Sequence, residues 1–209
     1  MFTAACSAWH RQRYSARMTL CPSPSPRLAP SPWVRRFTPC LPPASRVLDV
    51  ACGSGRHVAW LTSQGHHVTG LDRDAAALAQ LPAGATALQA DIESDPWPLP
   101  GQQFDAVVVT HYLWRALWPQ LLDSVRPGGV LIYETFAEGN AAYGKPARPD
   151  FLLRPGELLQ VCAGWHVVAY EHGLLQAPLR VVQRIVAVRP PVTPASVALE
   201  ATGTAAAVS

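Results

Sequence analysis

Three aspartates and two glycines form the most chemically suggestive pattern in the chain. Asp49 lies in the apolar run "RVLDVA", which leads directly into the glycine turn "CGSG" with Gly53 and Gly55. Asp72 and Asp91 end two later runs, "HVTGLD" and "ATALQAD". Glycines let the backbone approach a ligand closely, and carboxylates accept hydrogen bonds from hydroxyl and amino groups. The pattern is typical of a site for a nucleotide-type cofactor.

The charge of Asp49 helps to distinguish phosphate-bearing cofactors from phosphate-free ones. A dinucleotide motif, G-x-G-x-x-G, needs a third glycine where this chain has Val58. A fixed negative charge near Gly53 repels a pyrophosphate and attracts a cation. S-adenosyl-L-methionine carries an ammonium and a sulfonium group and no phosphate. Asp72 can accept hydrogen bonds from the ribose hydroxyls of either cofactor, so an NAD-dependent oxidoreductase stays open as the alternative.

An α/β domain would bring these residues together. From Arg46 onward, short β-branched runs alternate with helical stretches, which predicts a mostly parallel sheet. Ligands of such sheets bind at the carboxyl ends of the strands, where the three aspartates would gather. The last two strands follow each other without a helical crossover, so one of them is antiparallel. We expect strands at residues 46–51, 67–72, 85–91, 105–110, 130–136, 165–172 and 183–189, and helices at 56–64, 75–81, 112–125 and 157–162.

Candidates for catalysis follow the fourth expected strand. His111 is suited to act as a general base, or else as a cap or structural hydrogen-bond partner at a helix start. Tyr112 is placed to flank the cofactor. Arg115 either steers an anionic acceptor or is a solvated helix residue.

The loop at residues 137–154 is long enough to cover a pocket. It contains glycines and three side chains that suit an anion, Tyr143, Lys145 and Arg148, and it is either a lid or a surface connector. Glu134, just before this loop, is a candidate for the same pocket.

A short helix is expected before the first strand. Ser31 and Pro32 suit its start, and Trp33 and Phe37 lie on one face of it. This helix either packs on the sheet edge or roofs the cofactor pocket. Cys52, inside the glycine turn, fits a small packing residue better than a nucleophile.

The motifs resemble those of class I S-adenosylmethionine-dependent methyltransferases, and within them bacterial small-molecule methyltransferases of the tellurite-resistance type. The resemblance rests on "RVLDVACGSGRH", "GHHVTGLDRD", "QADIE", "FDAVVVTHYL" and "VRPGGVLIYETF". It implies a Rossmann-like, mostly parallel seven-stranded sheet with one antiparallel strand and helices on both faces. By motif position it also implies a set of cofactor-binding residues: Asp49, Ala51, Gly53 and Gly55 around the methionyl moiety, Asp72 on the ribose, Asp91 with Ile92 on the adenine, and Thr110 behind the reactive centre.

Charge and composition bear on the partners. Six of the 17 basic residues lie in residues 1–45, which leaves eleven basic and fourteen acidic residues in 46–209. The folded part therefore lacks the basic excess of a nucleic-acid-binding domain. It also has "THYL" where methyltransferases of base amino groups often carry an Asp/Asn-Pro-Pro-Tyr/Phe turn. We expect a small-molecule acceptor, no nucleic acid, no membrane, and a monomer or weak dimer.

The remaining expectations concern location and domain limits. Five cysteines without a C-x-x-C pair favour a reducing cytoplasm and no metal site. We expect a disordered, basic, proline-rich extension at residues 1–30, the methyltransferase domain at 31–190, and a disordered tail at 191–209. Because a fold does not fix a function, a catalytically silent cofactor-binding protein is a further alternative.

Overall fold

The computed structural model describes residues 29–192. The expected disordered segments lie outside the described residues, apart from residues 29, 30, 191 and 192. The domain limits at 31 and 190 stay a prediction.

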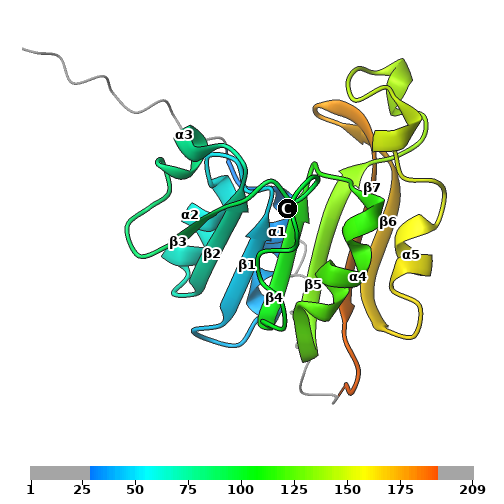
Figure 1. The fold of residues 1–209 in the computed structure, drawn as a ribbon. Helices are drawn as coiled ribbons and strands as arrows, with labels where there is room; N and C mark the ends of the chain where they lie inside the picture. The colour runs from blue at the N-terminus through cyan, green and yellow to red at the C-terminus, as the bar shows by residue number, and fades with distance from the viewer. Residues whose placement is uncertain (1–28, 193–209) are drawn as a thin grey trace, which may run out of the picture.

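A single seven-stranded sheet forms the centre of the described part of the chain (Figure 1). Its strand order is β3-β2-β1-β4-β5-β7-β6, and β7 alone runs antiparallel to its neighbours. The predicted mostly parallel sheet with one reversed strand is confirmed. The strands are β1 (Arg46–Val50), β2 (His67–Asp72), β3 (Thr86–Gln89), β4 (Phe104–Thr110), β5 (Val125–Phe136), β6 (His166–Gln176) and β7 (Leu179–Val188).

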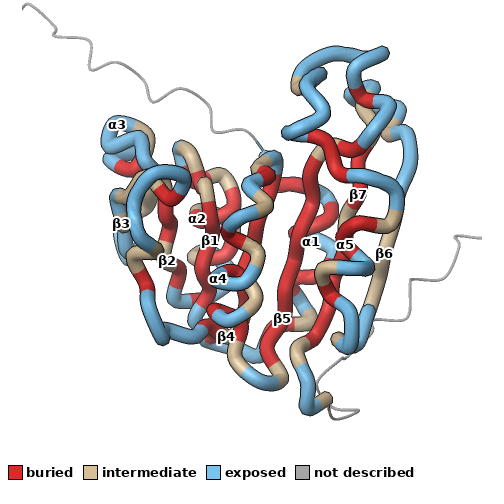
Figure 2. The backbone as a smooth tube through the Cα atoms, turned by 45° about the vertical axis from the view of Figure 1, so that its right-hand side comes forward, coloured by how far each residue is buried: buried red, intermediate tan, exposed pale blue. Residues whose placement is uncertain are grey.

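Helices cover both faces of the sheet, as predicted. Apolar residues of α1, α2 and α3 pack on one face, and those of α4 and α5 pack on the other. Because both faces are covered, the central strands are buried almost throughout, which explains their nearly continuous apolar sequences (Figure 2). The helices are α1 (Pro32–Phe37), α2 (Arg56–Ser63), α3 (Ala75–Leu78), α4 (Trp118–Asp123) and α5 (Glu157–Val161), with 3-10 turns at Thr38–Cys40, Arg115–Leu117, Asn140–Ala142 and Pro149–Phe151.

The first helix forms as its sequence indicates. The Ser31 hydroxyl caps α1 by accepting a hydrogen bond from the Trp33 amide at 3.1 Å. Trp33 and Phe37 are buried against the sheet, and the Trp33 indole N–H donates to the carbonyl of Ile185. Helix α1 therefore packs against a face of the sheet, and not against its edge as one of the two alternatives had it.

Two local predictions were wrong. The single helix expected at 112–125 is instead a 3-10 turn followed by α4, because Trp114 has an extended backbone. Helix α4 begins beside Pro119, which lies in its first turn, where the missing N–H is tolerated. The strand expected at 130–136 begins earlier, since β5 starts at Val125 and includes "RPGG", and its pairing with β4 shifts register between Phe104 and Ala106. Its Gly128 has φ 73°, which lets β5 bend there without ending.

Candidate functional site

The candidate site lies where the strand order reverses, at the carboxyl ends of β1 and β4. Connections from adjacent strands run to opposite sides at such a point and leave a crevice in which α/β proteins bind ligands. The residues just after these two strands, Ala51 and His111, have φ of 53° and 55°. Left-handed backbone is uncommon in residues other than glycine, and it clusters at ligand sites.

The glycine turn brings the backbone to this crevice. Gly53 and Gly55 have φ of 53° and 77°, and a side chain at Gly55 would collide with Leu81. The Gly53 amide donates to Asp72 Oδ2 at 2.7 Å, which joins the turn to the end of β2. The backbone conformation therefore favours glycine at both positions, and a side chain at Gly55 would also have to displace the Leu81 side chain.

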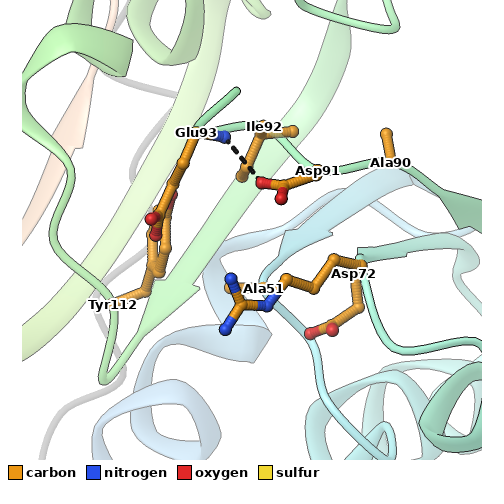
Figure 3. A pocket seen from close by; sticks show the side chains of 8 residues that line it. Ala51, Asp72, Ala90, Asp91, Ile92, Glu93 and Tyr112 are labelled. Carbon is orange, nitrogen blue, oxygen red and sulfur yellow. Dashed lines mark hydrogen bonds between the residues drawn. The ribbon is translucent and has the colours of Figure 1, made fainter. Parts of the chain in front are cut away.

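Asp72 and Asp91 meet at one pocket beside the turn (Figure 3). Asp72 accepts from the amides of Gly53 and Asp74, and its oxygens keep lone pairs for further donors. Asp91 accepts from the Glu93 amide at 3.1 Å, which lowers the pKa of its carboxyl. The pocket is lined by Ala51, Asp72, Arg73, Ala90, Asp91, Ile92, Glu93 and Tyr112.

A second hollow continues from the first at Ala51. Thr110 lines it at the end of β4, and its hydroxyl lies 3.3 Å from His57 Nδ1. Cys52 lies in its wall, where burial and two nearby aspartates raise the thiol pKa, as suits a packing residue. The lining consists of Ala51, Cys52, Gly53, Ser54, Arg56, His57, Thr110 and His111.

Asp49 lies directly behind this second hollow without a partner. Its carboxylate is 1% exposed and neither oxygen has a hydrogen-bond partner. Burial raises its pKa to about 7, although the Arg56 charge and the Val58 amide act to lower it. A buried carboxylate without a cation is costly, so its environment suits a positively charged ligand.

His57 lies between Asp49 and the hollow as a neutral imidazole. Its Nε2 accepts from the Ser31 amide at 3.1 Å, so its proton resides on Nδ1, which lies 4.0 Å from Asp49. Burial and the nearby Arg56 charge lower its pKa to about 3. His57 therefore does not supply the missing cation.

A third hollow adjoins the other two on the β5 side. It shares Tyr112 and Glu93 with the first and His111 with the second, so the three form one groove. The Tyr112 hydroxyl is buried without a hydrogen-bond partner, and burial raises its pKa, which keeps it an O–H donor. The third hollow is lined by Glu93, His111, Tyr112, Leu113, Thr135, Phe136, Pro146 and Phe151.

His111 is held between two arginines. Its Nδ1 lies 3.3 Å from Arg56 and its Nε2 lies 3.1 Å from Arg180. Desolvation by the surrounding side chains and these two charges lower its pKa to about 4, although part of the residue remains exposed. A neutral imidazole has one lone pair, and an arginine N–H already faces it, so the geometry favours a positioning role for His111 over a general base.

The structure places Arg115 outside the groove lining. Its guanidinium donates to Glu157 at 2.7 and 2.9 Å and to the carbonyls of Asp150 and Leu152. Those carbonyls flank Phe151, which lines the third hollow. Arg115 is thus built to position that wall.

The other candidates on the β5 side also lie apart from the groove lining. Tyr143, Lys145 and Arg148 are exposed, and Arg148 pairs with Asp150 at 2.9 Å. From the same loop, Pro146 and Phe151 reach the groove instead.

Glu134 is fully buried and lines none of the three hollows. It accepts from Ser31 at 2.8 Å and pairs with Arg184 at 3.1 Å. In residues 29–192, no group of three or more His, Cys, Asp or Glu side chains is arranged to hold a metal ion.

Sequence reasoning missed two residues of the site, Arg56 and Arg180. Arg56 directly follows the glycine turn, and this position was the available signal. Arg180 lies 69 residues beyond His111 and approaches it only because β7 returns beside β5. No local pattern marks it.

The strand order, the reversed β7, the glycine turn after β1 and the acid at the end of β2 together define the class I, S-adenosylmethionine-dependent methyltransferase fold. A family model described as a methyltransferase domain matches residues 47–129. Residues 47–129 thus match a methyltransferase domain, S-adenosylmethionine is the cofactor that this match implies, and the predicted resemblance is confirmed.

Solved structures of methyltransferases share this fold. TehB from Haemophilus influenzae superposes with a TM-score of 0.62 at 19% identity, over 75% of this chain and 61% of that one. A SAM-dependent methyltransferase from Methanosarcina mazei gives 0.60 at 16% identity, over 78% and 99%. Hemagglutinin 1 of Eikenella corrodens is 27% identical over 157 residues, which cover 69% of this chain and 50% of that protein. The chain thus spans about half the length of this curated relative.

Proposed function

We propose that the chain transfers a methyl group from S-adenosylmethionine to a small-molecule acceptor. The unpaired, buried carboxylate of Asp49 behind the glycine turn carries the proposal, because it suits a cationic cofactor and opposes a pyrophosphate. The same observation weighs against the NAD-dependent alternative.

The residues fit the cofactor along the first two hollows. Asp72 and Asp91 would hold the ribose and adenine, and Gly53 and Thr110 would lie along the methionyl part. Gly55 lines neither hollow and would act only by shaping the turn. When bound, S-adenosylmethionine supplies an electrophilic methyl group on a sulfonium. Displacement at this methyl needs alignment and exclusion of water more than acid or base strength.

The third hollow is the proposed place for the acceptor. Its walls include the apolar side chains of Leu113, Phe136 and Phe151, which suit an acceptor with an apolar part. Tyr112 stands between this hollow and the first, so its free hydroxyl can orient a ligand from either side. The groove is formed by a single compact domain, which favours a small acceptor.

Calorimetry on the full chain tests the proposal with two ligands, S-adenosylhomocysteine and NAD⁺. We expect binding of S-adenosylhomocysteine and none of NAD⁺, and the reverse would overturn the choice of cofactor. Incubation with methyl-labelled S-adenosylmethionine and fractionated cell extract then tests turnover. Label in small metabolites supports the proposal, label confined to RNA or protein refutes the small acceptor, and no transfer to any fraction favours a silent cofactor-binding protein.

No helix in the described part of the chain has the length and apolar character needed to cross a bilayer.

A further inference from the structure

Two guanidinium groups at the junction of the second and third hollows lack a counter-ion. Arg56 and Arg180 approach opposite nitrogens of His111, at 3.3 and 3.1 Å. Neither forms a salt bridge with a carboxylate in residues 29–192. The Arg180 Nε is also buried without a hydrogen-bond partner.

This arrangement contrasts with the neighbouring arginines, which are paired. Arg115 pairs with Glu157 at 2.7 Å, and Arg184 pairs with Glu134 at 3.1 Å. The Arg56 environment is itself unfavourable, since burial lowers the pKa of its guanidinium, although Glu134 and Asp49 attract it from beyond salt-bridge range. Arg56 and Arg180 are half-buried and face a neutral imidazole, so the arrangement favours an anion from outside the described chain.

The surroundings indicate what kind of anion would fit. His111 lines both the second and third hollows, so the two charges lie where an acceptor would meet the methyl donor. The third hollow offers the apolar walls Leu113, Phe136 and Phe151. A ligand with an apolar body and one carboxylate or other oxyanion matches this combination.

We propose that Arg56 and Arg180, spaced by His111, form an anion subsite for the carboxylate or oxyanion of the methyl acceptor. The inference rests on the proposed function. A planar guanidinium binds an oxyanion through charge-assisted, paired hydrogen bonds. The subsite would hold the acceptor's charged end and leave its nucleophilic atom toward the second hollow.

The cofactor's own carboxylate is the other source of the same chemistry. Arg56 lines the hollow assigned to the methionyl part, so the two sources have to be separated by experiment. Methylthioadenosine, which lacks the amino-acid end, provides that separation.

The probe is benzoate, with benzamide as its neutral counterpart of similar shape. Calorimetry uses the full chain saturated with S-adenosylhomocysteine, and compares wild type with Arg56→Gln and Arg180→Gln. The matched control is Arg126→Gln. Arg126 pairs with Asp105 at the amino-terminal ends of β4 and β5, away from the groove at their carboxyl ends. Arg180→Lys keeps the charge, and circular dichroism verifies the fold of each variant.

We expect wild type and Arg126→Gln to bind benzoate in preference to benzamide. Each of the other Gln variants should bind benzoate about tenfold more weakly, as the loss of a hydrogen bond to a charged group implies, and Arg180→Lys should retain part of the affinity. Equal binding of benzoate and benzamide, or unchanged benzoate binding in both Gln variants, would overturn the subsite.

Two further outcomes separate the possible failures. If the Gln variants lose affinity for S-adenosylhomocysteine but not for methylthioadenosine, the arginines hold the cofactor's carboxylate and the acceptor subsite is refuted. If wild type binds no S-adenosylhomocysteine at all, the proposed function fails, and benzoate binding to the free protein then tests the anion site on its own.

Discussion

Buried carboxyl groups differ between the two halves of the sheet: they are unpaired on one side and paired with arginines on the other. On the β1–β3 side, Asp49 is buried without a partner and its pKa is raised by burial. On the β5–β7 side, Glu134 and Glu157 each pair with an arginine. At Glu157 burial acts to raise the pKa, but hydrogen bonds from Arg115 and the Arg154 amide hold it below its usual value.

The paired charges stabilise the fold, and the unpaired charges are the ones suited to bind a ligand. A buried ion is tolerated when protein groups neutralise it, and it is otherwise costly. Asp49 has no hydrogen-bond partner, and Arg56 and Arg180 form no salt bridge in residues 29–192. Arg56 lines the second hollow, while Asp49 and Arg180 lie next to His57 and His111, which line the groove. We therefore infer the charges of the ligands from the opposite charges of these unpaired groups.

The largest effect on stability is expected from the paired half. Glu134→Gln removes the charge that Arg184 and Ser31 contact, so the free energy of unfolding should fall by about 3 kcal/mol. Urea denaturation measures it. The control is Glu171→Gln, which also touches Arg184 but is 43% exposed and should cost under about 1 kcal/mol. Equal losses in the two variants would show that burial of the pair does not matter.

The next effect concerns the cofactor side. Asp72→Ala removes the acceptor for the ribose hydroxyls, and affinity for S-adenosylhomocysteine should fall by about 1.5–3 kcal/mol. Calorimetry checks this with Asp95→Ala, an exposed loop acid, as control. Wild-type affinity in a folded Asp72→Ala protein would mean that the first hollow does not bind the ribose.

These expectations show how far the sequence reaches. The glycine turn and the acids at the ends of β1 and β2 could be predicted, because strand polarity brings successive carboxyl ends to one edge. The break in the helix expected at 112–125 could not be predicted, since Trp114 adopts an extended backbone that its sequence does not signal.

Pairings between distant segments were also beyond the sequence. Arg115 suits either an anion or solvent, and only the fold shows its bonds to Glu157 and to the carbonyls beside Phe151. Arg180 is hidden for the same reason. Lys145 and Arg148 look suited to an anion by type, yet they are exposed and do not line the groove.

A smaller, local effect is expected at Arg115. Arg115→Ala frees the carbonyls of Asp150 and Leu152, so amide hydrogen exchange should accelerate at residues 150–153. Benzoate affinity should fall by roughly threefold, because the Phe151 wall loosens, whereas affinity for S-adenosylhomocysteine should not change. Unaltered exchange at these amides would rule out the positioning role.

The smallest effect is expected from the exposed loop residues. The double variant Lys145→Ala/Arg148→Ala should change benzoate affinity by less than about twofold, because an exposed ion pair such as Arg148 with Asp150 contributes little. A tenfold loss in the same calorimetric assay would restore the loop as an anion-binding lid.

The central claim is that Asp49 awaits a cation, and the pH dependence of cofactor affinity tests it most directly. In the free protein its pKa is raised to about 7, and a bound ammonium or sulfonium would lower it. Affinity for S-adenosylhomocysteine, whose ammonium persists in this range, should therefore rise by up to about tenfold per unit between pH 5 and 7 and then level off.

Asp49→Asn is the matched variant for this measurement. Because the pKa of the folded state lies above that of the unfolded chain, the contribution of Asp49 to stability is present at low pH and lost as pH rises through about 7. At pH 8, Asp49→Asn should thus unfold at a higher temperature than wild type without ligand, yet bind S-adenosylhomocysteine more weakly and with little dependence on pH. Equal affinities of the two proteins across pH 5–8 would contradict the claim.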